Sequence, residues 1–240
     1  MNNYKSSFLN SIPPIVKNII AINVILWLVT LVLPSLVIRW GFNVDLTDIL
    51  GMHYWASSKF NPAQLITYMF MHGGFNHIFF NMFALYMFGT VLENLWGPKR
   101  FLFYYLITGI GAGLIQQLFW TVEYHSALTA INEAISSNVM NAPSLIAQKE
   151  QFLNMFITIG ASGSVFGLLL AFGWLFPEAK LMLIFFPVPI KARIFVLIYG
   201  VIELFMGVAQ FSGDSVAHFA HLGGMLFGAL LILWWKKKEF

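Results

Sequence analysis

The chain contains no cysteine and very little charge. Only 10% of its 240 residues are charged, whereas soluble domains carry about 25%. The missing cysteines exclude disulfides, thiolate metal sites and a cysteine nucleophile. Hydrophobic residues make up 59% of the chain, with a mean hydropathy of +0.76, and a soluble core of this length cannot bury so much apolar surface. The composition therefore indicates a membrane protein, because a bilayer surrounds each helix with an apolar solvent.

Basic residues are also few, and no basic patch is interleaved with aromatic residues. Thirteen Lys and Arg side chains produce the pI of about 9.1. Charge in cytoplasmic loops explains them better than a nucleic-acid surface does. We therefore expect the lipid bilayer as a partner and no nucleic acid.

Six segments are apolar enough to be membrane spans, each of which takes roughly 20 residues. They cover approximately residues 19–38, 64–92, 101–122, 152–176, 194–211 and 216–235. The chain has no internal repeat or low-complexity tract. We therefore predict an all-α membrane protein, a six-transmembrane-helix bundle forming one domain over residues 1–240. Residues 1–18 form a short cytoplasmic segment and residues 236–240 a cytoplasmic tail in this prediction.

The basic residues orient the predicted bundle. If the N-terminus is cytoplasmic, six crossings place most Lys and Arg inside, as the positive-inside rule expects. The inside group is Lys5, Lys17, Lys99, Arg100, Lys180, Lys191, Arg193, Lys236, Lys237 and Lys238, and the outside group is Arg39, Lys59 and Lys149. Both termini are therefore predicted to be cytoplasmic. The outer loop over residues 123–151 has a composition that allows a short surface helix.

Costly polar residues gather toward the outer ends of three predicted spans. They are His72, His77 and Asn81 on the second, Ser162 between Gly160 and Gly163 on the fourth, and His218 and His221 on the sixth. Each has an ordinary explanation by itself: a serine can bond to the carbonyl four residues back, glycines permit close helix packing, and a histidine can be interfacial. Their matched depth on three helices indicates one site instead.

Serine and histidine are the residue types that nucleophilic catalysis needs. The hydroxyl of Ser162 requires an adjacent base, and histidine titrates near neutral pH. His77 and Asn81 are four residues apart and share a helix face, from which both can donate hydrogen bonds to an oxyanion. No Asp or Glu is obviously placed to orient the base, which favours a Ser-His dyad over a triad. Glu203, inside the fifth span, is interpreted as structural, with a gate or water-lining role as the alternative.

Three motifs carry a family resemblance. Residues 160–163 with Phe166 resemble the GxSG motif of the rhomboid intramembrane serine proteases, of bacterial type, and its downstream aromatic residue. Residues 220–224 with Gly228 resemble the AHxxG-xxx-G motif, and His72, His77 and Asn81 resemble the HxxxxHxxxN segment of the second helix. Similarity extends over about residues 62–234, including the connection formed by Glu93, Trp96, Gly97, Arg100 and Phe101.

The resemblance implies a role for each matching residue. Ser162 would be the nucleophile and His221 the base. His77, Asn81 and the Ser162 amide would stabilise the oxyanion, and Phe166 would pack against the His221 ring. Supporting positions would be Gly160, Gly163, Gly224, Gly228 and His72, with the last two glycines bringing the sixth helix close to the fourth.

The resemblance also implies what the protein acts on. The family cleaves transmembrane protein substrates within or next to their spans, without metal or another cofactor. The chain departs from the family in its first outer loop, where the usual Trp-Arg pair is replaced by the reversed Arg39-Trp40. No organelle-targeting extension is recognised, so we expect a prokaryotic plasma membrane, with the site opening to the outer side. The sequence predicts neither the substrate nor the oligomeric state.

Three other functions fit part of the pattern. A metal-dependent membrane hydrolase could use His72, His77, His218 and His221 with Asp214 or Glu203 as zinc ligands, although the HExxH pattern is absent. A catalytically inactive relative could bind membrane clients, but the chain keeps both Ser162 and His221. A transporter would usually carry inverted repeats, and none is recognised.

Overall fold

The computed structural model describes residues 11–137, 139–183, 186–211 and 216–238, and most of them are helical. The elements in chain order are α1 (Pro14–Val37), α2 (Leu46–Leu50), β1 (Met52–His53), α3 (Gln64–Thr67), α4 (Phe75–Ala84), α5 (Thr90–Trp96), α6 (Pro98–Glu123), α7 (His125–Ser137), α8 (Ala142–Asn154), β2 (Ile157–Thr158), α9 (Ser162–Leu175), β3 (Lys180–Leu183), β4 (Phe186–Lys191), α10 (Ala192–Ala209) and α11 (His218–Lys238). A π-helical turn over Leu85–Gly89 joins α4 to α5.

Among the described residues, five helical segments are long and apolar enough to cross a membrane. They are α1 with its 3₁₀ extension, the continuous run from α4 to α5, α6, α10 and α11. The helix α9 is apolar but has only 14 residues. The predicted class, an all-α membrane bundle, is confirmed, while the count of six spans and the cytoplasmic location of both termini stay predictions.

The second predicted span begins later than the hydropathy suggested. Helix α3 ends at Thr67, a 3₁₀ turn covers Tyr68–Phe70, and α4 begins at Phe75. The break lies at residues 71–74, where Met71 has an extended backbone and two glycines lower the helix propensity. His72 therefore precedes α4, and the expectation that it lies on the same helix as His77 is wrong.

The fourth predicted span is also shorter than expected. Helix α8 ends at Asn154, and an extended stretch containing β2 leads to Gly160. Gly160 has a φ of 125°, which side-chain-bearing residues rarely adopt. Its amide donates to the carbonyl of Tyr68 at 2.9 Å. Ser162 is consequently the first residue of α9 rather than a residue in the middle of a span.

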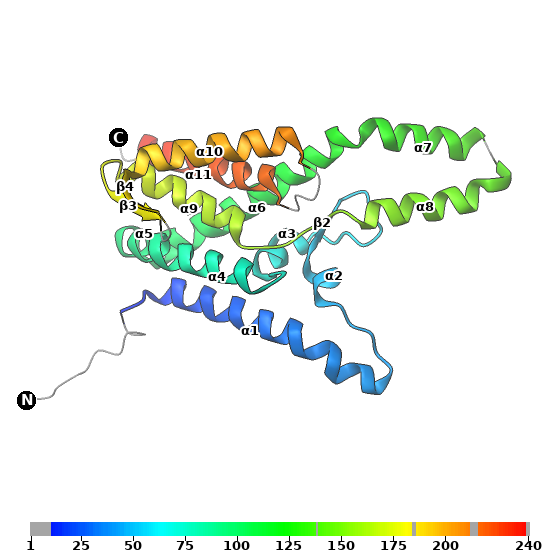
Figure 1. Cartoon of the computed structure of the whole chain (residues 1–240), viewed down its shortest axis with the longest axis horizontal. Helices are drawn as coiled ribbons and strands as arrows, with labels where there is room; N and C mark the ends of the chain where they lie inside the picture. Colours follow the sequence, from blue (N-terminus) through cyan, green and yellow to red (C-terminus); the bar gives the residue numbers. More distant parts are fainter. Residues whose placement is uncertain (1–10, 138, 184–185, 212–215, 239–240) are drawn as a thin grey trace, which may run out of the picture.

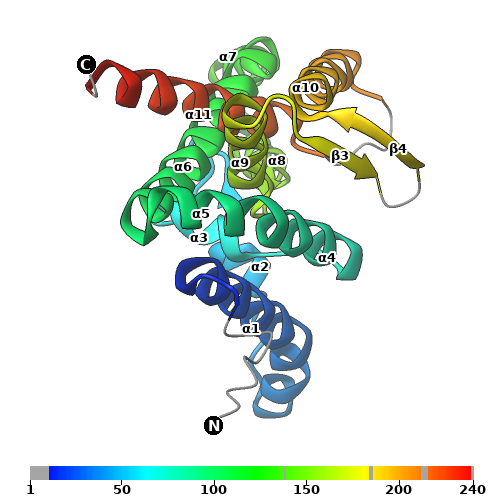
Figure 2. The ribbon, with the colours of Figure 1, turned by 90° about the vertical axis from the view of Figure 1, so that its left-hand side faces the viewer.

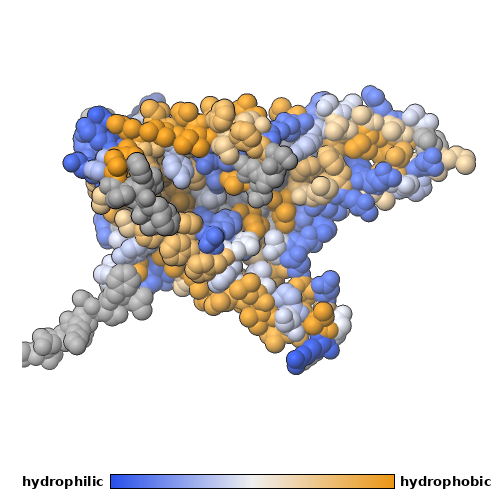
Figure 3. Space-filling model, viewed as in Figure 1, coloured by the Kyte–Doolittle hydropathy of each residue, from blue (hydrophilic) through white to orange (hydrophobic). Residues whose placement is uncertain are grey.

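Helix α9 occupies the centre of the bundle. Figures 1 and 2 place it among α6, α11, α10 and the α4–α5 run, with α1 at the edge next to α4. Close approach is possible because α9 is rich in glycine, and the Tyr104 hydroxyl of α6 donates to the carbonyl of Gly167 at 2.8 Å. Helices α1 and α10 instead expose much of their apolar surface, seen as orange areas in Figure 3. These exposed faces fit contact with lipid.

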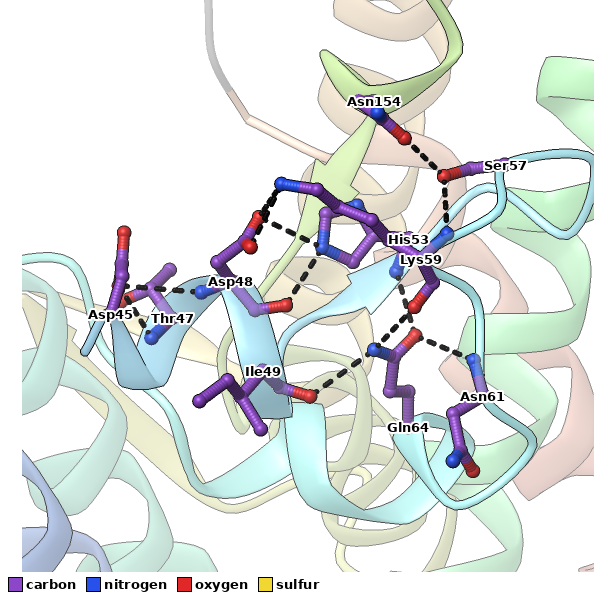
Figure 4. Close-up of polar contacts among 10 residues, drawn as sticks. All are labelled: Asp45, Thr47, Asp48, Ile49, His53, Ser57, Lys59, Asn61, Gln64 and Asn154. Carbon is purple, nitrogen blue, oxygen red and sulfur yellow. Dashed lines mark hydrogen bonds and ion pairs between the residues drawn. The ribbon is translucent and has the colours of Figure 1, made fainter. Parts of the chain in front are cut away.

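The predicted first outer loop is tied to the strand that leads into α9. Strand β1 pairs antiparallel with β2, with Met52 opposite Thr158. The buried amide of Gln64 accepts hydrogen bonds from the backbone of His53 and Asn61 and donates to the carbonyls of Ile49 and Lys59 (Figure 4). This polar network fixes the end of the bundle at which β2 turns toward Gly160.

The second outer loop forms a helical hairpin rather than one short surface helix. Helices α7 and α8 have 13 residues each and extend beyond the bundle on the right of Figure 1. The start of α1, the end of α11 and the β3–β4 hairpin all lie toward the opposite end in Figure 1, although Figure 2 shows them apart from one another. This arrangement is consistent with both termini lying on one side of a membrane.

Candidate active site

Ser162 and His221 meet between α9 and α11. The Ser162 Oγ lies 2.7 Å from Nε2 of His221, a hydrogen-bond distance. His221 is buried, with 8% of its surface exposed. The two helices approach this closely because Gly224, one turn after His221, rests on the carbonyl of Gly163 with no room for a Cβ between them. Gly228, a turn further along, lies in the same way against the hydroxyl of Tyr104.

The ring of His221 is held by an aromatic neighbour. Phe166 follows Ser162 by one turn of α9 and stacks on the imidazole, with centroids 4.2 Å apart and planes at 8°. The contact restricts the rotation of His221 about its side-chain bonds. The Nε2 atom is thereby kept on the Ser162 side of the ring.

His77 approaches the loop that precedes Ser162. A Cβ on Gly160 would lie 2.6 Å from the His77 Nε2, so only glycine allows this contact. The amide of Gly73 donates to Nδ1 of His77 at 3.4 Å. With Nδ1 accepting, the proton of a neutral imidazole sits on Nε2 and points toward the Gly160 side. His77 is therefore a donor next to the start of α9.

Asn81 lies one turn further along α4 and is buried. Its amide nitrogen donates to the carbonyl of His77 at 2.8 Å. Asn81 and His77 thus share a face of the helix, as the spacing predicted. An amide carries two donor hydrogens, so this bond leaves one of them for another acceptor.

Two other polar residues lie in this part of the bundle without reaching the Ser162 hydroxyl. His72 is buried, and its ring packs edge-on against His77 with centroids 4.8 Å apart. Ser164 points to α6, where its hydroxyl donates to the carbonyl of Tyr105 at 2.7 Å. Ser162 and Ser164 consequently occupy different faces of α9, and only Ser162 faces a histidine among the described residues.

Sequence reasoning missed a carboxylate beside His221. The Oε2 atom of Glu203 lies 2.8 Å from Nδ1 of His221 and 2.6 Å from Nδ1 of His218. The expectation that no Asp or Glu is placed to orient His221 is therefore wrong, while the choice between a dyad and a triad stays a prediction. The sequence did contain a sign of this contact, because Glu203 is the one carboxylate well inside a predicted span. What the pattern did not reveal was the rotation of α10 that turns it toward α11.

Among the described residues, Glu203, His218 and His221 form the group that could bind a metal ion. The ligand atoms of Glu203, His218 and His221 lie within 4.8 Å of one another. His72 and His77, which the sequence had offered as further ligands, form a separate ring pair. Asp214 lies outside the described residues.

The geometry supplies the parts that acyl transfer needs. A hydroxyl is in hydrogen-bond contact with an imidazole nitrogen, and the imidazole is in contact with a carboxylate. Ser162 is the first residue of α9, and the first amides of a helix have no acceptor within it, while His77 is a donor nearby. A carbonyl carbon next to the Ser162 Oγ would therefore have hydrogen-bond donors close to its oxygen.

Comparison with known proteins gives a consistent result. The family described as the Rhomboid domain matches residues 59–237. A yeast protein, Rhomboid protein 1, mitochondrial, is 34% identical over 170 residues, covering 71% of this chain and 41% of that protein. Rhomboid-like protein 11, chloroplastic, of Arabidopsis thaliana is 29% identical over 191 residues, covering 74% and 53%.

A bacterial relative is also similar. A Bacillus subtilis protein, named as a candidate rhomboid protease, is 30% identical over 102 residues, which cover 40% of this chain and 46% of that protein. The chain thus spans about half or less of the length of these relatives.

Proposed function

Since the chain belongs to the rhomboid family, we propose that it is an intramembrane serine endopeptidase that cleaves transmembrane proteins within or next to their spans. The observation that carries the proposal is the 2.7 Å contact between Ser162 Oγ and His221 Nε2. A serine hydroxyl needs such a base to become a nucleophile. In this chain the pair is set between membrane helices, where a peptide bond in a span could reach it.

The proposed reaction follows from the two side chains. The Ser162 Oγ forms a bond to the carbonyl carbon of the scissile peptide, and its proton passes to Nε2 of His221. The carbonyl electron pair moves to the oxygen and returns as the C–N bond breaks, with His221 giving the proton to the leaving amine. A water molecule then attacks the Ser162 ester in the same way and releases the acid.

The proposed oxyanion site consists of His77, Asn81 and the Ser162 amide. His77 presents Nε2 beside Gly160, and the amide of Ser162 belongs to the free first turn of α9. All are neutral donors, so they can stabilise a developing negative charge without a counter-ion in the resting site. Asn81 would redirect its second amide hydrogen to the oxyanion.

Cleavage of a reporter span tests the proposal. The full chain is reconstituted into vesicles with a single-span substrate carrying a helix-destabilising segment near its outer end. We expect two products from the wild type and none from His221→Ala at equal folded concentration. Equal cleavage by the wild type and His221→Ala would contradict the proposal.

A metal-dependent hydrolase is the second candidate, favoured by the cluster of Glu203, His218 and His221. Two imidazoles and a carboxylate are a suitable ligand set for zinc. A chelator separates the two functions. The serine mechanism predicts unchanged cleavage after prolonged treatment with a chelator, and the metal mechanism predicts loss of cleavage and recovery with zinc.

The proposed setting is a prokaryotic plasma membrane with the site facing outward. The protein is an integral membrane protein of the rhomboid family, and its relatives include proteins named as mitochondrial and chloroplastic. The outward orientation rests on the distribution of Lys and Arg residues between the loops. The proposed partners are transmembrane substrates and lipid.

A further inference from the structure

Glu203 is an unusual residue on the buried face of a helix that is otherwise largely exposed. Its neighbours on α10, Val201, Ile202, Leu204 and Phe205, are all exposed apolar side chains, whereas Glu203 is 6% exposed. A carboxylate in a membrane helix is costly and is retained where specific partners satisfy it. Both partners here are imidazole nitrogens on α11, and one of them belongs to the proposed base.

The contacts of Glu203 determine which nitrogen of His221 carries the proton. The Oε2 atom accepts from two imidazoles, and an ionised carboxylate can only accept. Both contacts are satisfied at once when His218 and His221 each donate from Nδ1. A neutral His221 with its proton on Nδ1 has a bare Nε2, and that atom faces the Ser162 hydroxyl at 2.7 Å. This is the tautomer that can accept the Ser162 proton.

We infer that Glu203 is a positioning residue that completes a Ser162–His221–Glu203 triad by fixing the tautomer and orientation of His221, an inference that rests on the proposed serine mechanism. The carboxylate also faces the imidazolium that forms when His221 takes the proton. In soluble serine proteases a buried aspartate has this role. Here the carboxylate comes from a different helix than either the nucleophile or the base.

His218 contacts the carboxylate of Glu203 rather than the hydroxyl of Ser162. It lies one turn before His221 on α11 and donates to the same oxygen at 2.6 Å. The two helices are close at this level because Gly207 of α10 has no side chain and would otherwise meet the Cβ of His218 at 3.1 Å. His218 therefore fixes the rotamer of Glu203, and its effect on turnover reaches His221 through that carboxylate.

Glu93 provides a matched control. It is likewise a buried glutamate on a membrane helix, 2% exposed. Its two oxygens accept from the backbone amides of Ile15 and Val16, at 3.0 and 2.8 Å, and so tie the start of α1 to α5. Glu93 has no contact with a histidine among these bonds. Loss of its charge is expected to weaken folding and leave the chemistry unchanged.

The test uses the full chain in vesicles, with Glu203→Gln, Glu203→Asp and Glu93→Gln. We expect Glu203→Gln to lower kcat on the order of 10²-fold with KM nearly unchanged, and Glu203→Asp to recover part of that loss. The corresponding change in a soluble protease costs about 10⁴-fold, and stacking on Phe166 keeps the ring of His221 in place here. Glu93→Gln should lower the melting temperature and keep the wild-type kcat.

Nitrogen-15 spectra of labelled histidine report which ring nitrogen of His221 carries the proton. A purely structural role of Glu203 would leave this tautomer unchanged. The signal of His221 is assigned by its absence in His221→Asn. We expect the proton on Nδ1 in the wild type and a population with the proton on Nε2 in Glu203→Gln. A wild-type His221 protonated on Nε2 overturns the inference without any variant, so it stays testable if Glu203→Gln fails to fold.

The outcomes separate the inference from the function on which it rests. Wild-type kcat and an unchanged His221 tautomer in folded Glu203→Gln would overturn the triad and leave the Ser162–His221 mechanism standing. Failure of the wild-type protein to react with a fluorophosphonate at Ser162 would overturn the serine mechanism, and the triad with it.

Discussion

Gly224 of α11 lies against the carbonyl group of Gly163 on α9, and a methyl group at Gly224 would overlap that carbonyl oxygen. The contact is between two backbones, so no side chain can rotate out of the way. Because Gly163 follows Ser162 directly and Gly224 lies three residues after His221, this contact sets the distance between the proposed nucleophile and base.

Gly224→Ala should therefore separate the two helices. Inserting a methyl group into a packed contact typically costs about 1–3 kcal/mol, and the Ser162–His221 hydrogen bond should be lost with it. We expect a lower melting temperature and little cleavage activity. Gly200→Ala is the control, because the new methyl there would meet only the flexible end of Met225, at 3.3 Å. Full activity in Gly224→Ala would show that the backbone contact does not control the site.

Ser162 and Ser164 offer a comparison within one turn of α9. Ser162→Ala should abolish cleavage of a transmembrane reporter and leave the fold intact, because the one hydrogen bond of its hydroxyl within the described part of the chain is to His221. Ser164→Ala should keep activity, since its hydroxyl bonds to the carbonyl of Tyr105 on the other face. Loss of the Ser164 hydroxyl should instead lower the free energy of unfolding by about 1 kcal/mol, the contribution of one hydrogen bond. If Ser164→Ala were inactive and Ser162→Ala active, the nucleophile would be Ser164, on the other face of α9, and the assignment of Ser162 would be wrong.

The oxyanion donors should affect turnover more than affinity. Removing one such donor in a soluble protease costs roughly 10² to 10³ in rate. We expect Asn81→Ala to lower kcat only about tenfold, because His77 and the Ser162 amide remain and water can substitute. The double variant His77→Ala with Asn81→Ala should be much slower, with KM changed little.

Measurement at equal folded concentration decides whether these residues act in catalysis. His72→Ala is the control: it removes the ring that packs against His77 and should reduce stability more than turnover. Unchanged kcat in the His77, Asn81 double variant would remove both residues from the proposed oxyanion site.

The orientation in the membrane can be read with single cysteines, because the chain has none of its own. Met140, between α7 and α8, is 92% exposed, and Lys237 lies near the end of α11. In intact cells an impermeant thiol reagent should label Met140→Cys and leave Lys237→Cys unlabelled until the membrane is opened. The reverse pattern would invert the predicted topology and place the site on the cytoplasmic side.

The sequence predicted the bundle because long apolar runs have few alternatives to helices in a membrane. It also predicted that His77, Ser162 and His221 form one site, and in the structure His77 lies beside Gly160 while the Ser162 hydroxyl contacts His221. The two misplaced helix starts have different causes: the two glycines before Phe75 lower the helix propensity, whereas the positive φ of Gly160 and the pairing of β1 with β2 delay the start at Ser162. Hydropathy averaged over a window does not register either.

The contact between Glu203 and His221 could not be predicted from spacing. It depends on how α10 is rotated about its axis, and on the close approach of α10 to α11 beside Gly207. Helix rotation is set by packing against neighbours rather than by the apolar content of a span. A lone glutamate in a span indicated that a partner exists, without indicating which residue it is.

Reaction of the wild-type protein with a fluorophosphonate probe tests the central claim most directly. The probe phosphonylates a serine only where a base activates its hydroxyl, and it requires no knowledge of the natural substrate. The site of modification is then mapped by mass spectrometry on the membrane-embedded chain. The account predicts modification of Ser162, and none in His221→Ala at equal folded concentration. An unmodified wild-type chain, or a label on Ser164 or any other residue, would contradict it.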